Sequence, residues 1–499
     1  MIQGTASSVG KSIIVAALCR IFKQDGFKVA PFKAQNMALN SYVTAEGGEV
    51  GRAQVVQAEA AGIAPTVDMN PVLLKPATDS MCQVIVLGKV ERTISARDYY
   101  QYTPALLETI KAALERLRAT YDIIVIEGAG SPAEINLKNS EIVNMRIARL
   151  AKAPVLLVGD IDRGGVFASL LGTLELLDKY EKKLVKGYII NKFRGDVNLL
   201  KPGLEFLEKR TGLPVLGVVP YFKDIRIAQE DSVYLDEREK ATAAGDLQIA
   251  LIRLPHISNY DDFDPLEQEG IAVSYITWPF EIGNPHLIII PGTKSTVSDL
   301  AYLRGSGLAA AILERAKRGT PVLGICGGYQ MLGKTILDPG SVESAEKEVP
   351  GLGLLDAITE FVPEKATTQV RAQVIADNGL LAGANGMEIS GYEIHMGQTK
   401  IGEKTSPFRI IETPQGAAEY PDGAVNEPGT VIGTYLHGLL HNDNFRELFL
   451  NNLRRHWGLR ENNGVNLDKE KGYDKLAELV RGNLDITQIY GMMAPDTTK

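Results

Sequence analysis

The chain has 499 residues, of which 45% are hydrophobic and 23% charged, and it carries a net charge of -8 with an isoelectric point near 5.5. This composition is that of a folded globular protein and excludes a disordered or membrane-embedded chain. The length exceeds what one hydrophobic core usually organises, so we expect two large domains. The acidic balance argues against nucleic acid as the main partner, because phosphate backbones select basic surfaces.

The cysteines and the N-terminus indicate the compartment. Cys19, Cys82 and Cys326 are too few for a disulfide framework and lack the spacing of metal ligands. No apolar run reaches the roughly 18 to 20 residues needed to cross a bilayer, and the chain opens on a glycine-rich motif instead of a signal peptide. We therefore predict a cytoplasmic protein without membrane insertion, and a homo-oligomer stays open.

Short β-branched runs recur along the chain, each followed by a glycine-containing turn and a helical pattern. Such runs predict parallel sheets covered on both faces, and hence an α/β fold with two doubly wound domains. The polar segment 235–246 predicts a linker between domains at 1–234 and 247–456, followed by a C-terminal helical tail at 457–499. The predicted strands are 28–32, 123–126, 154–158, 187–190, 215–219, 248–254, 287–290, 321–325 and 431–435.

The N-terminal motif reads M-I-Q-G-T-A-S-S-V-G-K-S and continues into an apolar helix that Gly26 could end. A glycine-rich loop between a strand and a helix lets backbone N–H groups surround a phosphate at the helix N-terminus, while a lysine adds charge and a serine hydroxyl binds Mg²⁺. The alternative is a chance Gly/Ser turn before a helix. The predicted ATP contacts are Gly4, Thr5, Gly10, Lys11 and Ser12.

The spacing of this loop is unusual, because five residues separate Gly4 from Gly10, whereas the common G-x-x-x-x-G-K-[ST] pattern has four. It resembles the G-T-x-x-x-V-G-K-[ST] loop of dethiobiotin synthetase-like P-loop enzymes, which implies that ATP activates a carboxylate. Only three residues precede Gly4, whereas a central strand usually has about five or six. We expect either a start a few codons upstream or a shortened first strand.

Polar side chains follow three predicted strands, where open parallel sheets bind ligands. Glu127 follows I-I-V-I, and Asp160 follows V-L-L-V-G. Either carboxylate could hold Mg²⁺ together with Ser12, or could cap the next helix instead. Asn191 and Lys192 follow the next strand and could border the adenine.

Residues 320–333 read T-P-V-L-G-I-C-G-G-Y-Q-M-L-G, which is a buried strand, a cysteine between small residues and a helix start. This pattern is typical of a nucleophile elbow, in which small neighbours permit a sharp turn and the helix N-terminus stabilises a thiolate. We expect Cys326 to attack a carboxamide. A buried structural cysteine is the alternative, and it fits Cys19 and Cys82.

A nucleophilic cysteine needs a general base. His437, at the end of V-I-G-T-Y-L-H, is our candidate, and His441 is the rival. His395 could contribute to substrate binding or only to packing. The predicted oxyanion donors are the N–H groups of Gly292, in the loop P-G-T-K-S, and of Gly327, after the cysteine.

The elbow G-I-C-G-G-Y-Q resembles the G-x-C-x-G-x-Q elbow of class I glutamine amidotransferases. The resemblance implies that Cys326 attacks glutamine and that His437 is the base. That class usually has Glu two residues after the histidine, whereas this chain has Leu439. The cobyrinic and cobyric acid amidotransferase branch shares this departure, which leaves open the group that orients His437.

Further segments resemble the cobyric acid synthase family over nearly the whole chain. They are P-F-K-A-Q-N-M-A-L-N-S at 31–41, G-R-A-Q at 51–54, N-P-V-L-L-K-P at 70–76, E-G-A-G-S-P-A-E-I-N-L at 127–137, D-I-D-R-G-G-V-F-A-S at 160–169, N-K-F-R-G-D at 191–196 and P-G-T-K-S-T at 291–296. The resemblance implies that ATP and glutamine amidate the b, d, e and g carboxylates of adenosylcobyrinic acid a,c-diamide. Each carboxylate would become an acyl phosphate, which ammonia released at Cys326 attacks.

Candidates for the phosphate or corrinoid carboxylate site are Lys33, Gln35 and Asn36, which follow the second predicted strand, although each could be a solvated loop residue. Because the corrinoid is a large anion, the basic residues Lys75, Arg163 and Arg194 are further candidates.

Two other functions fit parts of the pattern. Cobyrinic acid a,c-diamide synthases share both domain types but differ in the substrate-loop motifs, and product analysis would separate them. A P-loop switch protein with a glutamine-sensing domain would hydrolyse ATP regardless of any corrinoid carboxylate. A switch function would not explain the nucleophile elbow or His437.

Overall fold

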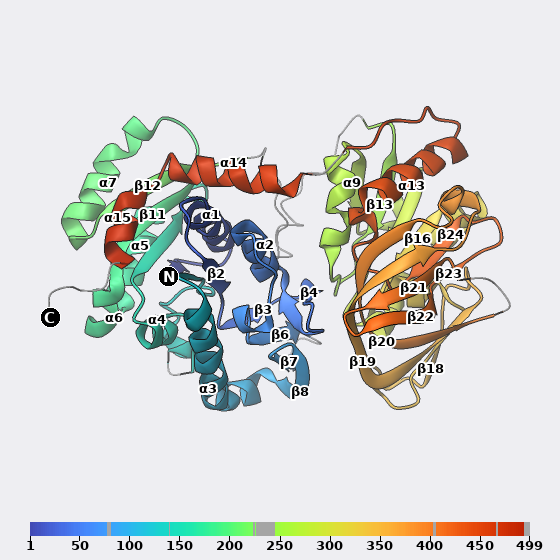
Figure 1. The fold of residues 1–499 in the computed structure, drawn as a ribbon, viewed down its shortest axis with the longest axis horizontal. Helices are drawn as coiled ribbons and strands as arrows, with labels where there is room; N and C mark the ends of the chain where they lie inside the picture. Colours follow the sequence, from blue (N-terminus) through green and yellow to red (C-terminus); the bar gives the residue numbers. More distant parts are fainter. Residues whose placement is uncertain are drawn as a thin grey trace. The chain divides into compact units, whose positions relative to one another are not determined.

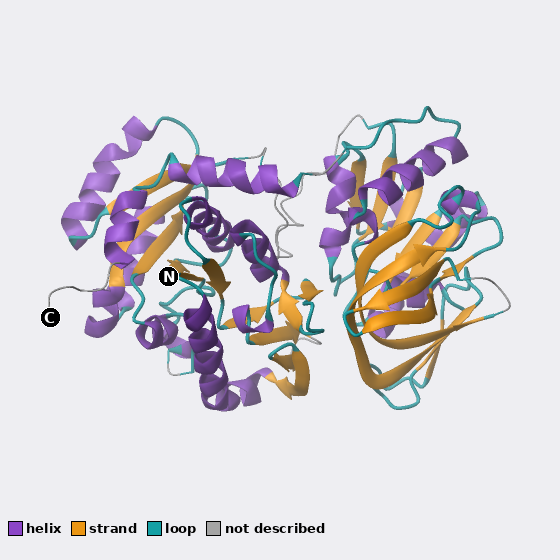
Figure 2. Cartoon of the chain, in the orientation of Figure 1, coloured by secondary structure: helices purple, strands orange, loops and turns teal. Residues whose placement is uncertain are grey.

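The structure is a computed structural model that describes residues 1–76, 81–138, 140–222, 225, 245–402, 406–465 and 468–493. Most of the predicted linker, 235–246, lies outside the described residues. The chain forms two compact units, and both combine helices with sheets (Figure 2), which confirms the α/β class. Unit 1 comprises Met1–Ala38, Val50–Gln229 and Asp468–Lys499, and unit 2 comprises Leu39–Glu49 and Glu230–Leu467.

A parallel sheet runs through unit 1. Strands β1, β10, β11 and β12 pair in that order, β2 pairs with β9, and a bridge between Ile2 and Glu127 joins β9 to β1. Strand β1 has three residues, all of which pair with residues 156–158 of β10. The carboxyl ends of these parallel strands meet at one edge, where ligands bind in such sheets. The strands are β1 (Ile2–Gly4), β2 (Val29–Phe32), β9 (Ile123–Ile126), β10 (Val155–Asp160), β11 (Val185–Phe193) and β12 (Val215–Pro220).

Helices cover both faces of this sheet (Figure 1). Successive residues of β10 show this, because Leu156 and Val158 pack in the core that α1 lines, whereas Val155 and Leu157 pack with α4, α5 and α7. The helices are α1 (Lys11–Gln24), α2 (Arg52–Ala61), α3 (Ala96–Thr120), α4 (Met145–Ala151), α5 (Val166–Leu176), α6 (Lys179–Leu184) and α7 (Val197–Thr211). A second, mixed sheet comprises β3 (Gln35–Met37), β6 (Val72–Pro76), β7 (Met81–Val86) and β8 (Lys89–Ser95).

Two C-terminal helices, α14 (Lys469–Arg481) and α15 (Ile486–Met493), belong to unit 1. Helix α14 lies along α1 (Figure 1), and Arg20 of α1 forms ion pairs of 2.7 Å with both Glu470 and Asp474. The hydroxyl of Tyr473 donates a hydrogen bond of 2.6 Å to Glu59. The residues of α14 that complete the core along α1 are Tyr473, Leu476, Ala477 and Val480.

We expect Leu476→Ala to lower the free energy of unfolding of unit 1 by about 2 to 5 kcal/mol, because Leu476 is fully buried and its truncation leaves a cavity. Calorimetry should show a lower melting temperature for one transition and an unchanged second transition from unit 2. Lys475→Ala, on the exposed face of the same helix, is the matched control and should change stability by less than about 0.5 kcal/mol. A transition unchanged by Leu476→Ala would contradict the docking of α14.

Unit 2 contains a second largely parallel sheet, in the order β14-β13-β15-β16-β24-β23, in which only the edge strand β23 is antiparallel. All four strands predicted for this half are present in it. The strands are β13 (Gln248–Ile252), β14 (Ala272–Ile276), β15 (Leu287–Ile290), β16 (Val322–Ile325), β23 (Ala424–Val425) and β24 (Val431–Thr434). The helices are α9 (Asp264–Gln268), α10 (Thr296–Gly305), α11 (Leu308–Lys317), α12 (Gly327–Leu332) and α13 (Asp443–His456).

Unit 2 also contains a mainly antiparallel sheet that the sequence analysis did not predict. Its residues alternate between buried and exposed along much of β19, so the sequence there lacks the continuous apolar runs of the parallel strands. The strands are β17 (Thr335–Leu337), β18 (Glu348–Pro350), β19 (Ala357–Val374), β20 (Glu388–Ile401), β21 (Phe408–Thr413) and β22 (Gly416–Asp422).

The contacts divide the chain differently from the contiguous predicted domains 1–234 and 247–456. Residues 39–49, with β4 (Ser41–Val43) and the start of β5 (Glu49–Gly51), pack in unit 2. Of the predicted tail 457–499, residues 457–467 belong to unit 2 and residues 468–499 to unit 1. We call residues 39–49 the arm. A chain segment belongs to the unit in which its side chains are buried. Sequence order alone does not determine which unit that is.

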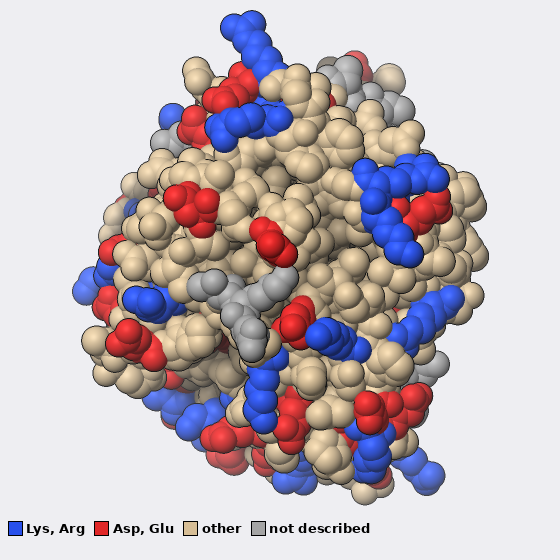
Figure 3. Space-filling model, turned by 90° about the vertical axis from the view of Figure 1, so that its right-hand side faces the viewer, with Lys and Arg blue, Asp and Glu red and all other residues tan. Residues whose placement is uncertain are grey.

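The surface charge agrees with the composition. On the face that Figure 3 shows, acidic and basic side chains are interspersed and wide areas are uncharged. Among the described residues, every helix falls short of the length or the hydrophobicity that a bilayer-spanning segment needs.

Candidate active sites

The glycine-rich loop connects β1 to α1 at the carboxyl edge of the sheet in unit 1. Gly10 precedes α1 with a φ of 96°, a left-handed conformation that favours glycine. A Cβ there would also lie 2.1 Å from Nδ2 of Asn191, which donates a hydrogen bond of 2.9 Å to the carbonyl of Val9. Asn191 therefore braces the loop itself, and its place beside the adenine stays a prediction.

The other predicted loop residues also hold this shape. The N–H of Thr5 donates to the carbonyl of Val158 at 3.0 Å, and a Cβ on Gly4 would approach Val9 to 2.5 Å. The Lys11 ammonium donates to the carbonyl of Ala6, in the loop, at 2.9 Å and to that of Gly130, after β9, at 3.2 Å. The loop thus presents a cation and the N-terminus of a 14-residue helix, which together suit a phosphate.

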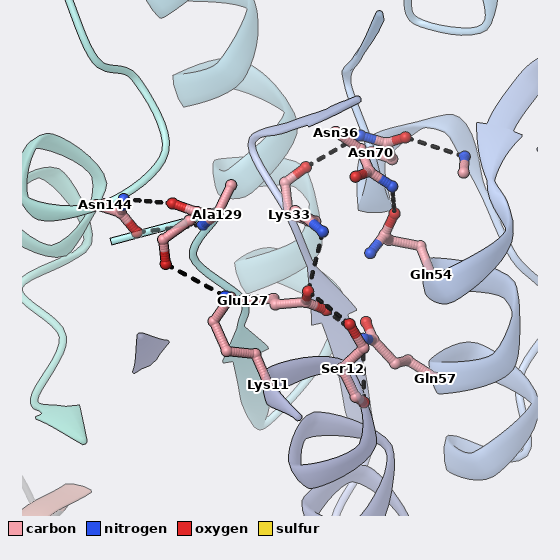
Figure 4. Close-up of polar contacts among 12 residues, drawn as sticks. Lys11, Ser12, Lys33, Asn36, Gln54, Gln57, Asn70, Glu127, Ala129 and Asn144 are labelled. Carbon is pink, nitrogen blue, oxygen red and sulfur yellow. Dashed lines mark hydrogen bonds and ion pairs between the residues drawn. The ribbon is translucent and has the colours of Figure 1, made fainter. Parts of the chain in front are cut away.

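A buried polar cluster surrounds Glu127, the residue that follows β9 (Figure 4). The hydroxyl of Ser12 and the ammonium of Lys33 each donate to Oε1 of Glu127 at 2.9 Å. Nε2 of Gln57, on α2, donates to Oε2 at 2.5 Å. The structure thus brings together three predicted site residues, Ser12, Lys33 and Glu127, and adds Gln57, which the sequence analysis missed.

The electrostatics of this cluster keep Glu127 ionised. Burial alone would raise the pKa of Glu127, but the charge of Lys33 and the hydrogen bonds from Lys33 and Gln57 outweigh it, so the pKa lies below its usual value. An ionised carboxylate beside a serine hydroxyl offers two hard oxygen ligands of the kind that Mg²⁺ prefers. Ser12 and Glu127 therefore fit the predicted metal site.

Asp160, the other predicted metal ligand, has different partners. Its carboxylate pairs with Nζ of Lys192 at 3.0 Å and accepts the N–H of Asp162 at 2.9 Å. The contacts described for Asp160 include neither Ser12 nor Glu127. The described residues contain no group of three or more His, Cys, Asp or Glu side chains that could hold a metal ion, so most ligands of a Mg²⁺ ion here would be phosphate oxygens and water.

Two buried side-chain atoms of this cluster have no hydrogen-bond partner among the described residues, Nε2 of Gln54 and Oε1 of Gln57. The other end of Gln54 accepts a hydrogen bond of 2.9 Å from Asn36, a predicted substrate residue (Figure 4). A buried unpaired donor and acceptor are costly unless a ligand pairs with them, so both suit a polar substrate. Gln35, by contrast, accepts the Tyr99 hydroxyl at 2.5 Å.

In unit 2, Cys326 lies between β16 and α12 in a strained turn. Its φ of 52° and ψ of −110° are unusual for a residue with a side chain. The neighbours must be glycine, because a Cβ would lie 2.6 Å from Leu332 at Gly324 and 2.0 Å from a backbone oxygen at Gly328. The thiol lies 3.6 Å from the carbonyl of Ile394. This geometry is that of the predicted nucleophile elbow.

His437 follows β24, is buried, and faces both an acid and the thiol. Its Nδ1 lies 2.7 Å from Asp262, whose second oxygen accepts the N–H of Gly438 at 2.8 Å. Nε2 has no hydrogen-bond partner among the described residues, while the Cys326 thiol interacts with the ring. Burial alone would lower the pKa of His437, but Asp262 and then Cys326 raise it to about 10.

Asp262 is the acid that orients His437, a role that the sequence left open because Leu439 stands where the glutamine amidotransferase class has Glu. Leu439 is buried and carries no acidic group, so the orienting carboxylate comes from a 3-10 helix (Tyr260–Phe263) 175 residues earlier in the chain. The only signal in the sequence was a pair of adjacent aspartates after a predicted strand. Without the fold, this pair does not point to His437.

The predicted oxyanion donors lie beside this site. A Cβ on Gly292 would approach Cε1 of His437 to 3.2 Å, and a Cβ on Gly327 would approach the backbone nitrogen of Thr293 to 3.2 Å. The loop after β15 and the start of α12 are therefore in contact next to the imidazole, which is where a tetrahedral oxyanion would form.

The remaining histidines have other partners. Nε2 of His441, the rival base, donates to the carbonyl of Asp261 at 2.9 Å. His395 stacks on Tyr435 with ring centroids 3.7 Å apart and donates from Nδ1 to the carbonyl of Gly397 at 2.7 Å. Burial lowers the pKa of His395 to about 4, so the ring is neutral. Its position one residue after Ile394 places it near the thiol.

Comparison with known proteins matches one family model to each half of the chain. Residues 1–233 match the family model of the CobQ/CobB/MinD/ParA nucleotide binding domain, and residues 248–445 match that of the CobB/CobQ-like glutamine amidotransferase domain. A cobyric acid synthase of Dehalococcoides mccartyi is 62% identical over 493 residues, which cover 99% of this chain and 98% of the relative. The chain belongs to the cobyric acid synthase family. A cobyric acid synthase of Sorangium cellulosum is 55% identical, and the match covers 97% of this chain and 96% of that relative.

Among solved structures, PurLQS from Thermotoga maritima is similar to part of this family member. It is 21% identical with a TM-score of 0.32, and the match covers 42% of this chain and 96% of that one.

Proposed function

We propose that this protein is a cytoplasmic enzyme that amidates the b, d, e and g carboxylates of adenosylcobyrinic acid a,c-diamide, with ATP and glutamine, to give adenosylcobyric acid. The observation that carries the proposal is the presence, in one member of the cobyric acid synthase family, of a phosphate loop beside ionised Glu127 and of a Cys326–His437–Asp262 site. The first suits carboxylate activation, and the second suits ammonia release.

In unit 1, Lys11 and the N-terminus of α1 face the phosphates of ATP. Ser12 and Glu127 would hold Mg²⁺, which would neutralise phosphate charge when bound. Lys33 and Gln54 orient the substrate carboxylate. A carboxylate oxygen attacks the terminal phosphorus, ADP leaves, and ammonia then displaces phosphate as the C–N bond forms and the C–O bond breaks.

In unit 2, Sγ of Cys326 attacks the carboxamide carbon of glutamine. His437 takes the thiol proton during this attack and gives it to the departing ammonia as the C–N bond breaks, while Asp262 accepts the Nδ1–H and fixes the ring. The N–H groups of Gly292 and Gly327 stabilise the oxyanion. Water then hydrolyses the thioester, releases glutamate and restores the thiol.

Mass spectrometry of the corrinoid tests this proposal. The protein is incubated with ATP, Mg²⁺, glutamine and adenosylcobyrinic acid a,c-diamide. We expect four successive losses of about one mass unit, because each conversion of a carboxyl to a carboxamide replaces OH by NH₂. A fixed mass while ATP is still consumed would reject this substrate. Activity only on cobyrinic acid, with two such losses, would identify an a,c-diamide synthase instead.

Glu127→Gln should lower ATP-dependent amidation by about 100-fold or more, because it removes the charge that pairs with Lys33 and binds Mg²⁺. ADP release and corrinoid mass measure the effect, and glutamate release measures the other site, which should keep its activity. Glu134→Gln, at an exposed position of the same loop, is the control. A Glu127→Gln enzyme with normal ADP release would remove Glu127 from the ATP site.

A further inference from the structure

The arm is held firmly in unit 2, although it lies in the sequence between β3 and α2 of unit 1. Near its end, the buried carboxylate of Glu49 forms an ion pair of 2.5 Å with Lys365 and accepts the Ser41 hydroxyl at 2.8 Å. In its middle, the carbonyl of Val43 accepts a hydrogen bond of 2.9 Å from Gln369. Buried, paired polar groups of this kind specify one docked position.

The first residues of the arm contact the 3-10 helix that carries Asp262. Oδ1 of Asn40 accepts the N–H of Tyr260 at 2.9 Å, and the carbonyl of Ser41 accepts Nδ2 of Asn259 at 2.6 Å. Tyr260 is the first residue of that helix, so its N–H has no partner within the helix, and Asn40 caps it from outside. The capped residue lies two positions before Asp262.

The arm also contacts Tyr392, which supports His437 from another side. Oη of Tyr392 donates to the carbonyl of Ser41 at 3.4 Å, and the ring of Tyr42 packs edge-on at 5.0 Å. The Tyr392 ring stacks on His437, with centroids 5.2 Å apart and planes at 16°. The backbones of Tyr392 and His437 exchange two hydrogen bonds, of 3.2 and 2.9 Å. Asp262 and Tyr392, which both hold the imidazole of His437, are therefore both held by contacts with the arm.

We propose that Asn40 and Ser41 are positioning residues of the glutaminase reaction, which hold Asp262 and Tyr392 and thereby fix the orientation of His437 toward Cys326. A segment that the sequence assigns to the ATP-binding half thus completes the glutaminase site. Glutamine hydrolysis then depends on a seated arm, which lies between β3 and α2 in the sequence. This inference rests on the proposed function only for glutamine as the ammonia source.

Kinetics of the full-length protein test it. Glutamate release gives kcat and KM for glutamine, and amidation with ammonium in place of glutamine gives the activity of the ATP site alone. We expect Asn40→Ala to lower the glutaminase kcat by about 10- to 100-fold, with KM changed by less than about threefold and ammonium-driven amidation unchanged. Asn40→Asp, which keeps an oxygen acceptor, should recover most of the loss.

Two further variants keep the test decisive. Tyr392→Phe keeps the stacked ring but removes the hydroxyl that meets Ser41 and Asn259, and it should lower kcat in the same way. Glu46→Gln, at the exposed tip of the arm, is the control and should match the wild type. Wild-type kcat in Asn40→Ala, or an equal loss of glutamine- and ammonium-driven amidation, would overturn the proposal. A corrinoid that never changes mass, even with the wild type, would reject the proposed substrate while leaving the glutamate assay interpretable.

Discussion

Cys326→Ala should abolish glutamine-driven amidation, with glutamate release reduced by at least about 10,000-fold, the order of effect expected when a catalytic nucleophile is lost. Ammonium-driven amidation should continue, because ATP-dependent activation of the carboxylate takes place at Ser12, Lys33 and Glu127 in unit 1. The two assays, run on the same preparation, separate the loss of a nucleophile from the loss of a fold.

The control for this variant is Cys19→Ala, which also truncates a buried cysteine. Cys19 lies on α1, and burial raises the pKa of its thiol, so it is inert as a nucleophile. Its replacement should leave glutamine-driven amidation in place and cost only packing. Glutamate release by Cys326→Ala at more than a small percentage of the wild-type rate would show that another group attacks glutamine.

The parallel strands were predictable because they are short and continuously apolar. The runs at 123–126 and 287–290 consist only of isoleucine, valine and leucine, and each is a strand of a central sheet. Strands β19 and β20 carry polar residues on one face, so no apolar run marked them. The arm and α14 each pack with a unit formed mainly by distant parts of the sequence, through polar contacts such as those of Asn40 and Arg20 and, for α14, through buried apolar residues. No local pattern encodes such partners.

The residues of the candidate sites also differ in whether the sequence alone predicted them. Motifs that fold locally, such as the loop around Lys11 and the elbow around Cys326, were recognised because their own glycines enforce the turn. Gln57 and Asp262 were missed, because their roles depend on partners 70 and 175 residues away. Such a residue can be recognised only when the fold brings it next to its partner, as Gln57 of α2 lies next to Glu127.

Asp262→Asn should have the largest effect on glutamate release of any residue that the sequence did not reveal. Its oxygen accepts the Nδ1–H of His437, so the amide variant favours the wrong tautomer or leaves that N–H less well held. Loss of the equivalent acid in a serine hydrolase lowers kcat by about 10,000-fold, and we expect glutamate release to fall by about 100- to 10,000-fold. Ammonium-driven amidation should stay intact.

The variant should also change how stability depends on pH. The pKa of His437 is about 10 in the folded protein, because Asp262 and Cys326 outweigh burial, and about 6.5 in the unfolded chain. A raised histidine pKa contributes stability that is fully present below about pH 6.5 and is lost as the pH rises through about 10. Asp262→Asn should therefore destabilise unit 2 most near pH 6 and least near pH 10.

Asp338→Asn is the matched control for the measurement of glutamate release. It also replaces a buried carboxylate of unit 2, but the oxygens of Asp338 accept backbone N–H groups of Val342, Glu343 and Ser344. It should cost stability without a large loss of glutamate release. If both variants lose glutamate release equally, Asp262 is a structural acid. If Asp262→Asn alone loses it, and loses stability mainly at the lower pH, the carboxylate acts through His437.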